Sequence, residues 1–570
     1  MKQNKLTVID FFCGAGGFSE GFRQQGFEII SGIDHWKPAI ETYNYNFNKN
    51  FTTRDILEFS KSIDEIEKLV NSDVIIGSPP CVSFSSSNKS GKADKSLGLE
   101  LTETFLRIVA VKKHMPNSKL KAWFMENVVN SKKFLKSHYT FNDLGLSSWA
   151  KKIGKSPNSL ALEIDSNSTI INSADYGSIQ SRKRAIVGEI IKYNKLIIPP
   201  KGYKSHKEIN ALPNYKNLKY LFENFPIPFQ KKSHHLVQDP LYNFYIPMNQ
   251  ITDHFYDTGI YKNEWENSKY LKVNHPYMGL MSFPENIENP SRTITATKIA
   301  NSRESIIFKS EITRKGDGEY RLPTVREAAI IMGFPITYQF IGSENSKWRL
   351  VGNAVCPSVS RALAKEVIKS LFGNIKTSIK ITKKQNLEGV LNLNTYNIKK
   401  FDNPPVKKVN ARFRRHPFKC GNMTVALSNF DIINNSKNIS KWHVTAFYGT
   451  GEGFESTKFK EDYYKKIEPI ILNNFEDGYK FINIINNGFS EKIGSSIELQ
   501  EMYELQKSSN GLLEPTLLVD EIVKIINKLD NSNVMFKQGE AKIFKKQTVP
   551  KKQLYALYAL TKITSIANKK

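Results

Sequence analysis

Short hydrophobic runs of strand length recur in the first part of the chain, at residues 8–12, 27–33, 74–76 and 122–125. Runs that are apolar at almost every position are typical of strands that are buried on both faces. This pattern predicts an α/β fold. In such folds the loops at the strand ends carry the chemistry, so the residues that follow each run are the first candidates for a functional site.

A cysteine follows the third run, in the segment Gly-Ser-Pro-Pro-Cys at 77–81. Pro79 and Pro80 restrict the backbone just before Cys81. A thiol held in a loop after a buried strand is a candidate nucleophile. A free cysteine is more often an inert small hydrophobic residue. The hypothesis that Cys81 is a nucleophile therefore depends on the other motifs of the chain.

A glycine-rich turn at 13–17 follows the first run and precedes a predicted helix at 19–25. Glycines allow a ligand to approach the backbone, and the start of a helix offers free N–H groups, which together predict a nucleotide-type cofactor site. The spacing is not the full dinucleotide fingerprint, and no P-loop lysine follows. The turn therefore favours a cofactor with a less charged tail.

Polar and aromatic residues at the next strand ends extend this site. Asp34 lies at the distance from the glycines at which a carboxylate meets a ribose in such folds. His35 and Trp36 offer flat rings that could cover an adenine. Asp55 follows a third short extended run and could accept a hydrogen bond from the adenine amino group. Alternatively, Asp34 and Asp55 cap the helices that follow.

Two further motifs carry ionisable side chains. Glu126 follows the run at 122–125 and could protonate a ring nitrogen while a thiol adds to the ring. Arg182 and Arg184 are two residues apart, so on a strand they share one face and could hold an oxygen-rich ligand.

In this order, the motifs resemble those of the cytosine-5 DNA methyltransferase family. The resemblance covers roughly residues 5–370 and rests on the glycine turn at 13–17, Pro-Cys at 80–81, Glu-Asn-Val at 126–128, Gln-x-Arg-x-Arg at 180–184, Ser-Arg-Thr-Ile-Thr-Ala-Thr at 291–297, Leu-Pro-Thr-Val-Arg-Glu-Ala-Ala at 322–329 and Gly-Asn-Ala-Val at 352–355. It implies a Rossmann-like, S-adenosylmethionine-dependent methyltransferase fold that acts on a flipped cytosine.

The resemblance also implies roles for individual residues. Cys81 would add to ring carbon 6, Glu126 would bind ring nitrogen 3, and Arg184 would bind the exocyclic oxygen. Arg182 would support Arg184 and help to lower the thiol pKa. The residues implied for binding S-adenosylmethionine are Phe12, Asp34, His35, Asp55 and Ile56 at the adenosine end and Gly14, Gly16, Gly17, Leu101, Asn353 and Val355 at the methionine end.

Three departures from the family pattern accompany this assignment. His35 stands where many members have Trp or Ile, and Val82 with Ser83 replaces a common Gln-Pro after the nucleophile. Around the last motif, Leu350 and Cys356 replace a frequent Gln and Pro. None of these changes removes a group that the chemistry requires.

Composition and the regularity of the hydrophobic pattern predict the domain organisation. The catalytic domain is expected at 1–199 and 292–372, with a small irregular target recognition domain at 200–291. A linker is expected at 373–410 and a basic α+β accessory domain at 411–570, where 423–427 and 442–448 read as strands and 517–526 as a helix. The polar, basic loop at 85–96 suits a lid over the site.

Charge and cysteine usage agree with this assignment. The chain has 82 Lys and Arg against 55 Asp and Glu, a net charge of +27, which indicates a polyanionic partner such as double-stranded DNA, although a lysine-rich proteome gives the same excess. Its 4 cysteines lack zinc-site spacing, so no metal is expected. No signal peptide or apolar span of about 18 residues is evident, so a cytoplasmic location without membrane contact is expected.

Two enzymatic alternatives remain. A C-terminal endonuclease would use Asp530 with Glu540 and Lys542, although that spacing arises by chance in charged segments. The other alternative is a tRNA cytosine-5 methyltransferase. The main hypothesis is the modification enzyme of a restriction-modification system, a monomer that acts alongside a cognate restriction endonuclease. A catalytically dead regulator is disfavoured, because Cys81, Glu126 and Arg184 are all present.

Overall fold

The computed structural model describes residues 5–80, 95–260, 262–273, 280–312, 319–374, 378–381, 415–421, 423–429, 442–448, 456–505, 508, 511–530, 534–539 and 547–570. They fall into two compact units, Met1–Asn403 and Pro404–Lys570. The boundary between the units lies inside the segment 373–410, for which the sequence predicts a linker.

A six-stranded sheet forms the centre of the first unit, in the order β2-β1-β3-β4-β8-β7. β1, β2, β3 and β4 are parallel neighbours, whereas β8 runs antiparallel to both β4 and β7. The bounds are β1 (Thr7–Phe11), β2 (Glu28–Ile33), β3 (Val74–Gly77), β4 (Ala122–Asn127), β7 (Ser168–Asn172) and β8 (Lys183–Ile190). The α/β fold and the four strands predicted from the hydrophobic runs are confirmed.

Two details differ from the sequence prediction. β4 continues through Glu126 and Asn127, because β8 extends the ladder by pairing Ile186 with Glu126 and Ala185 with Asn127. The extended run expected before Arg54 is not a strand, since residues 49–55 are irregular and Arg54 N–H donates instead to the Asp34 carbonyl, at 3.0 Å.

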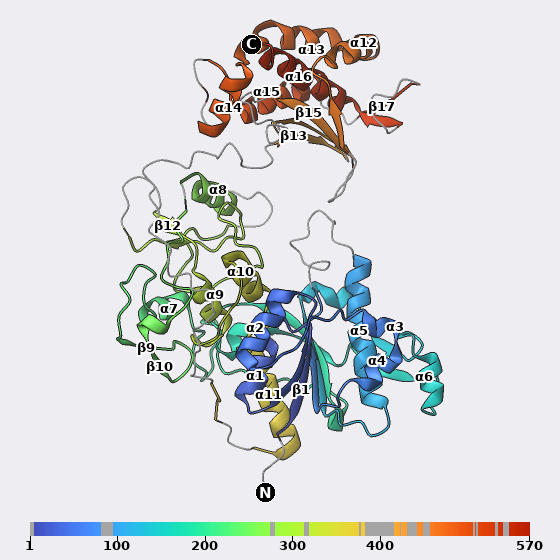
Figure 1. The fold of residues 1–570 in the computed structure, drawn as a ribbon, viewed down its shortest axis with the longest axis vertical. Helices are drawn as coiled ribbons and strands as arrows, with labels where there is room; N and C mark the ends of the chain where they lie inside the picture. Colours follow the sequence, from blue (N-terminus) through green and yellow to red (C-terminus); the bar gives the residue numbers. More distant parts are fainter. Residues whose placement is uncertain are drawn as a thin grey trace. The chain divides into compact units, whose positions relative to one another are not determined.

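Helices cover both faces of the sheet (Figure 1). One layer holds α1 (Gly17–Gln24), α2 (Lys37–Phe47) and α11 (Pro357–Phe372), and the other holds α3 (Glu58–Lys61), α4 (Ile63–Lys68), α5 (Lys95–His114) and α6 (Ser147–Lys152). On β3, Val74 and Ile76 join the hydrophobic cluster of the first layer, and Ile75 joins that of the second. This alternation is the reason why every residue of the strand is apolar.

The chain returns to the sheet through α11, which packs along α1. Gly21 makes this contact possible, because a Cβ there would overlap Ser360 and the backbone of Arg361. Ser360 Oγ donates to the carbonyl oxygen of Phe18, at 2.7 Å. Residues near 360 thus complete the layer that residues 17–24 begin.

The chain between the sheet and α11 forms shorter elements. They are α7 (Leu218–Asn224), β9 (Leu236–Gln238), β10 (Tyr245–Pro247), α8 (Lys262–Val273), β11 (Phe308–Lys309), β12 (Tyr320–Arg321), α9 (Val325–Met332) and α10 (Glu344–Asn353). Earlier in the chain, β5 (His138–Thr140) and β6 (Leu160–Glu163) form a separate two-stranded antiparallel sheet.

Residues of the interval 200–291 contribute to two hydrophobic clusters. Tyr242 belongs to the same cluster as α1 and α9, and its hydroxyl donates to the Gly333 carbonyl, at 2.6 Å. Ile260 and Trp265 instead pack with residues that follow 291, including Ile307. The contacts of this interval therefore extend into both neighbouring parts of the chain.

The second unit contains a four-stranded antiparallel sheet, β13 (Arg415–Cys420), β14 (Met423–Ser428), β15 (His443–Tyr448) and β16 (Ser456–Phe459). Its helices are α12 (Tyr464–Asn474), α13 (Gly478–Ile484), α14 (Ser496–Leu505), α15 (Pro515–Leu529) and α16 (Lys551–Ala567), and β17 (Met535–Lys537) pairs with β18 (Thr548–Pro550). α16 is buried along most of its length and is central to this hydrophobic core. The strands and the helix predicted here are confirmed as β14, β15 and α15.

Candidate functional site

The glycine turn adopts backbone conformations that favour residues without a side chain. Gly14 and Gly16 have φ angles of 52° and 85°, and Gly16 is the N-cap of α1. A Cβ on Gly16 would overlap the ring of Phe47, and one on Gly17 would overlap the Val355 carbonyl oxygen. Protein atoms therefore fill the space beside Gly16 and Gly17, whereas a Cβ on the half-buried Gly14 would meet only the Phe12 carbonyl oxygen, at 4.0 Å. The turn lies at the ends of the parallel strands, where α/β folds bind nucleotide-type cofactors.

Asp34 connects this turn to the end of β2. Its Oδ2 accepts from Gly14 N–H at 3.0 Å and its Oδ1 from Trp36 N–H at 2.9 Å. Asp34 thus holds the glycine turn and Trp36, but it does not cap the following helix as the alternative expects, because the N-cap of α2 is Trp36 and no side chain caps it. Each carboxylate oxygen has more than one lone pair, so these contacts leave acceptor capacity for a ribose hydroxyl.

The two rings after Asp34 have different environments. The His35 side chain is 76% exposed, and its Nδ1 lies 3.7 Å from Asp34 Oδ1. Trp36 packs on the hydrophobic core, and the Arg349 guanidinium lies 4.7 Å from its ring centroid. His35 is therefore the more accessible of the two rings.

The other predicted adenosine contacts lie on the chain that returns past the end of β2. Ile56 is buried, and Asp55 is exposed with its Oδ1 accepting from Leu57 N–H, at 3.0 Å. Asp55 therefore holds the turn before α3 and does not cap that helix as the alternative expects, because the N-cap of α3 is Leu57 and no side chain caps it. Phe12, at the start of the glycine turn, has a φ of 54° and packs on the core of the second helix layer.

The predicted methionine-end residues lie on three elements. Leu101 is half-buried on α5, Asn353 is exposed at the end of α10, and Val355 is buried directly before α11. The structure brings Val355 against Gly17, as described above. Glycines, an acidic strand end and apolar neighbours could together hold an adenosine joined to an uncharged or cationic tail, so the residues present fit S-adenosylmethionine.

A buried carboxyl group lies beneath this turn. Asp10, on β1, accepts from Ser19 Oγ at 2.7 Å, and Ser19 Oγ also lies 2.6 Å from the Tyr43 hydroxyl oxygen. Burial raises the pKa of Asp10 to about 8, with a smaller contribution from the charge of Asp34 and a lowering effect of Ser19.

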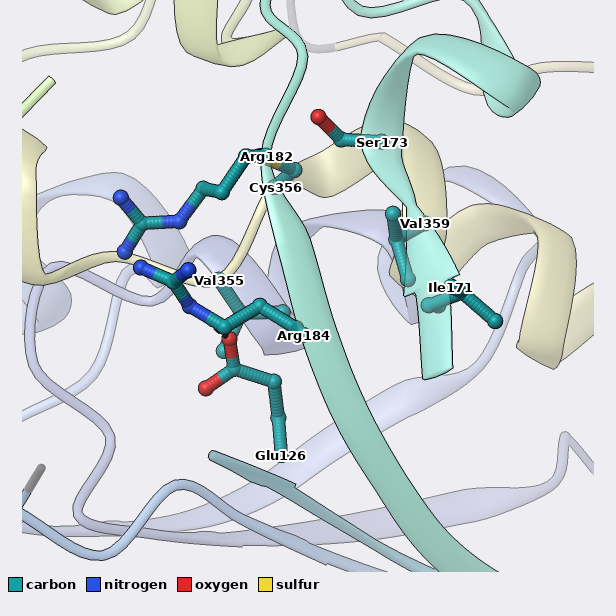
Figure 2. Close-up of a pocket in the computed structure, with 8 residues that line it drawn as sticks. All are labelled: Glu126, Ile171, Ser173, Arg182, Arg184, Val355, Cys356 and Val359. Atoms are coloured by element: carbon teal, nitrogen blue, oxygen red, sulfur yellow. Dashed lines mark ion pairs between the residues drawn. The ribbon is translucent and has the colours of Figure 1, made fainter. Parts of the chain in front are cut away.

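Two of the catalytic side chains predicted from the sequence, Glu126 and Arg184, meet where β4 ends and β8 begins. Glu126 Oε1 lies 3.1 Å from Arg184 Nε, and Glu126 Oε2 accepts from Ser78 Oγ at 2.7 Å. Figure 2 shows the Glu126 carboxylate against Arg184. Cys81 lies outside the described residues, and the chain is described up to Pro80, which follows β3 at the same edge of the sheet.

Arg182 has a different set of partners. Its guanidinium donates to the carbonyl oxygens of Ile294 at 3.1 Å, Gly352 at 3.0 Å and Ala354 at 3.4 Å. It is buried and connects two of the late motifs to the start of β8. Arg182 is therefore a clamp between segments, and it extends in the same direction as Arg184 (Figure 2).

A narrow pocket of about 10 Å³ lies beside these groups. Its lining residues are Glu126, Ile171, Ser173, Arg182, Arg184, Val355, Cys356 and Val359 (Figure 2). Burial raises the pKa of the Cys356 thiol, while Arg182 and Ser173 oppose that shift. Its lining combines a carboxylate acceptor, guanidinium donors and apolar side chains, which are the kinds of group that bind a flat heterocycle with polar edges.

Sequence reasoning missed two lining or supporting residues, Ser78 and Ser173, and treated Cys356 only as a departure from the family pattern. A signal for Ser78 was present, because it follows β3 as Glu126 follows Met125 in the neighbouring strand. Ser173 and Cys356 had no such signal, since their approach depends on how α11 packs.

Two other predictions concern the second unit and metals. Asp530 is buried, and its Oδ2 lies 3.7 Å from Lys551 Nζ, whereas Glu540 and Lys542 lie outside the described residues. Within the described part of the chain, no group of three His, Cys, Asp or Glu residues could hold a metal ion. Among the helices of that part, none has the length and apolar character needed to cross a bilayer.

Comparison with known proteins gives a consistent result for the first unit. Residues 6–369 match the family described as C-5 cytosine-specific DNA methylase. Type II methyltransferase M.HgiDI of Herpetosiphon aurantiacus is 27% identical over 361 residues, which are 63% of this chain and 93% of that protein. Type II methyltransferase M.HindV of Haemophilus influenzae is 30% identical over 247 residues, or 41% of this chain and 71% of that protein. A 105-residue stretch is 45% identical to Type II methyltransferase M.HgiGI of Herpetosiphon aurantiacus, covering 18% of this chain and 80% of that protein.

Proposed function

Because the chain belongs to the C-5 cytosine-specific DNA methylase family, we propose that it methylates carbon 5 of a flipped cytosine within a specific double-stranded DNA sequence, using S-adenosylmethionine. The observation that carries the proposal is the Glu126–Arg184 pair at the edge of the sheet to which Pro80 leads. A carboxyl group and a guanidinium are the partners that the polar edge of cytosine needs.

The chemistry begins with the ring, because carbon 5 of cytosine is a weak nucleophile. The Cys81 thiolate adds to ring carbon 6 and forms a carbon–sulfur bond, while Glu126 supplies a hydrogen bond or proton to ring nitrogen 3. Arg184 binds the exocyclic oxygen, where negative charge accumulates. These contacts make carbon 5 electron-rich.

S-adenosylmethionine supplies an electrophilic methyl group when it is bound. After transfer, a base removes the proton from carbon 5, the carbon–sulfur bond breaks and the thiolate of Cys81 is restored. Arg182 acts on this sequence indirectly, because it holds the 294 and 352–354 segments around the pocket.

The target base must leave the duplex to reach a pocket among buried side chains. Flipping costs a few kcal/mol, which contacts with the rest of the DNA must offset. We assign recognition of the bases to the interval 200–291. We assign additional contacts with the DNA backbone to the second unit, because its basic character suits a DNA-binding or clamping module.

Lys465 and Lys466 are exposed on α12, so reversing their charge should weaken DNA binding and reduce its salt dependence.

Labelled methyl transfer tests the proposal directly. Wild-type protein is incubated with labelled S-adenosylmethionine and either duplex DNA or tRNA, and the products are digested to nucleosides. We expect 5-methylcytosine from duplex DNA only, and labelling of tRNA alone would overturn the choice of polymer. Cys81→Ser should abolish turnover but retain DNA binding, and duplex containing 5-fluorocytosine should trap wild type covalently. Methyl transfer by Cys81→Ser would contradict the mechanism.

The cellular role follows from the same activity. We propose that the enzyme works in the cytoplasm and protects the sites of a cognate restriction endonuclease. Bisulfite sequencing of a genome that carries this gene should reveal one short sequence with a modified cytosine at nearly every occurrence. Scattered modification without a shared sequence would contradict a role in restriction and modification.

A further inference from the structure

The Glu126 carboxylate is held from two sides. Arg184 Nε lies 3.1 Å from Oε1, and Ser78 Oγ donates to Oε2 at 2.7 Å. The Glu126 side chain is 7% exposed, so these protein groups largely replace water around the carboxylate. The Arg184 partner belongs to the motif that identifies the family, whereas the proposed mechanism gives Ser78 no role.

The parallel register of β3 and β4 brings Ser78 to this position. Gly77 is paired with Met125, so the next residues of the two strands, Ser78 and Glu126, stand opposite each other. A second contact lies one residue further, where Asn127 Nδ2 donates to the Pro79 carbonyl at 3.3 Å. Both residues that precede the Pro80–Cys81 step are therefore connected to the end of β4.

We propose that Ser78 is a positioning residue that holds Glu126 in the orientation needed at ring nitrogen 3, an inference that rests on the proposed function. A glutamate side chain has three rotatable bonds, and a single contact through Arg184 leaves the second oxygen able to swing. Ser78 removes that freedom before the substrate binds. Preorganisation of this kind lowers the reorganisation needed in the transition state.

A hydroxyl group is suited to this task. It donates to a carboxylate, and it can donate to or accept from the neutral carboxylic acid, so the contact survives both protonation states of Glu126. Arg184 only donates and cannot adapt in this way. Ser78 also lies three residues before Cys81, so the same contact fixes the carboxyl group relative to the strand that carries the nucleophile.

The test compares full-length Ser78→Ala, Ser78→Gly and Ser78→Thr with wild type. The matched control is Ser72→Ala, which removes the hydroxyl of a buried serine that donates to the Val74 carbonyl oxygen at 2.9 Å, near the opposite end of β3. Measurements are kcat, the KM values for duplex DNA and S-adenosylmethionine, the rate of adduct formation with 5-fluorocytosine duplex, and thermal unfolding.

We expect kcat and the adduct rate to fall about ten- to one hundredfold in Ser78→Ala, as for loss of a hydrogen bond to a charged group, with both KM values within about twofold of wild type. Ser78→Thr should restore most of the loss, and Ser72→Ala should keep the wild-type kcat. Should Ser78→Ala unfold early, Ser78→Gly gives the same comparison. An unchanged kcat in the folded variant overturns the inference.

A double-mutant cycle with Glu126→Gln locates the effect. If Ser78 acts through Glu126, Ser78→Ala should change the residual activity of Glu126→Gln by less than about twofold. A full additional loss in that background would show that Ser78 acts elsewhere and would overturn the inference. Failure of the proposed function has a different signature, since wild-type protein would then form no 5-methylcytosine at all.

Discussion

The carbonyl oxygen of Val355 occupies the space that a Cβ on Gly17 would need, so the first turn of α1 and the segment entering α11 meet backbone to backbone. Residues more than 300 positions apart in the sequence thereby form one wall of the candidate cofactor site. The contact explains why the chain must return after residue 292 before the site is complete.

Gly17→Ala should therefore damage both stability and cofactor binding. The added methyl group overlaps backbone, which cannot rotate away as a side chain can, so a loss of about 1–3 kcal/mol in unfolding free energy is expected. Chemical denaturation and calorimetric titration of S-adenosylmethionine measure the two effects. Gly202→Ala is the control, because its Cβ would meet only the Asp175 carbonyl at 3.8 Å. Equal behaviour of the two variants would contradict the close packing.

Arg184→Lys should lower kcat while the fold persists. Lysine keeps the positive charge but cannot contact Glu126 and a substrate oxygen from one planar group. We expect a loss of about one hundredfold or more in methyl transfer, as for removal of a preorganised donor. Lys183→Ala, at an exposed neighbouring position, should retain activity. Near wild-type turnover in Arg184→Lys would refute the role in which this side chain contacts Glu126 and a substrate oxygen at the same time.

Arg182→Met should act mainly on structure. The substitution leaves the carbonyl oxygens of Ile294, Gly352 and Ala354 without their buried donor, which should cost on the order of 3 kcal/mol in unfolding free energy. Urea denaturation of Arg182→Met and of the exposed control Lys183→Met measures the difference. If Arg182→Met lost activity but unfolded like the control, the clamp would not be its main contribution.

Asp10 should make the stability of the first unit depend on pH. Its pKa is about 8 in the folded protein against 3.8 in the unfolded chain, so between these values the folded state binds one more proton. This contribution to stability is fully present below pH 3.8, declines by about 1.4 kcal/mol per pH unit at most, and is lost as pH rises through 8.

Asp10→Asn removes the titrating group and should flatten this slope between pH 6 and 8. Asparagine can still accept from Ser19 through its side-chain oxygen, so the fold should persist. Urea denaturation at several pH values provides the comparison with wild type. Parallel pH profiles for the two proteins would rule out Asp10 as the source.

Much of the site followed from local sequence. The apolar runs predicted β1 to β4, because strands buried on both faces need hydrophobic side chains at every position. Parallel strands end at a common edge, so the sequence alone places the glycine turn, Asp34 and the segment leading to Cys81 near one another. The motif order then identified the family, which the match over residues 6–369 establishes.

Contacts between distant segments were decided only by the tertiary structure. No local pattern indicates that Arg182 serves carbonyl groups of Ile294, Gly352 and Ala354, or that Trp36 packs beneath Arg349. The extension of β4 through Glu126 likewise depends on pairing with β8. Sequence periodicity reports which side of an element is buried, but partners, register and hydrogen-bond direction are set by the packing of the whole unit.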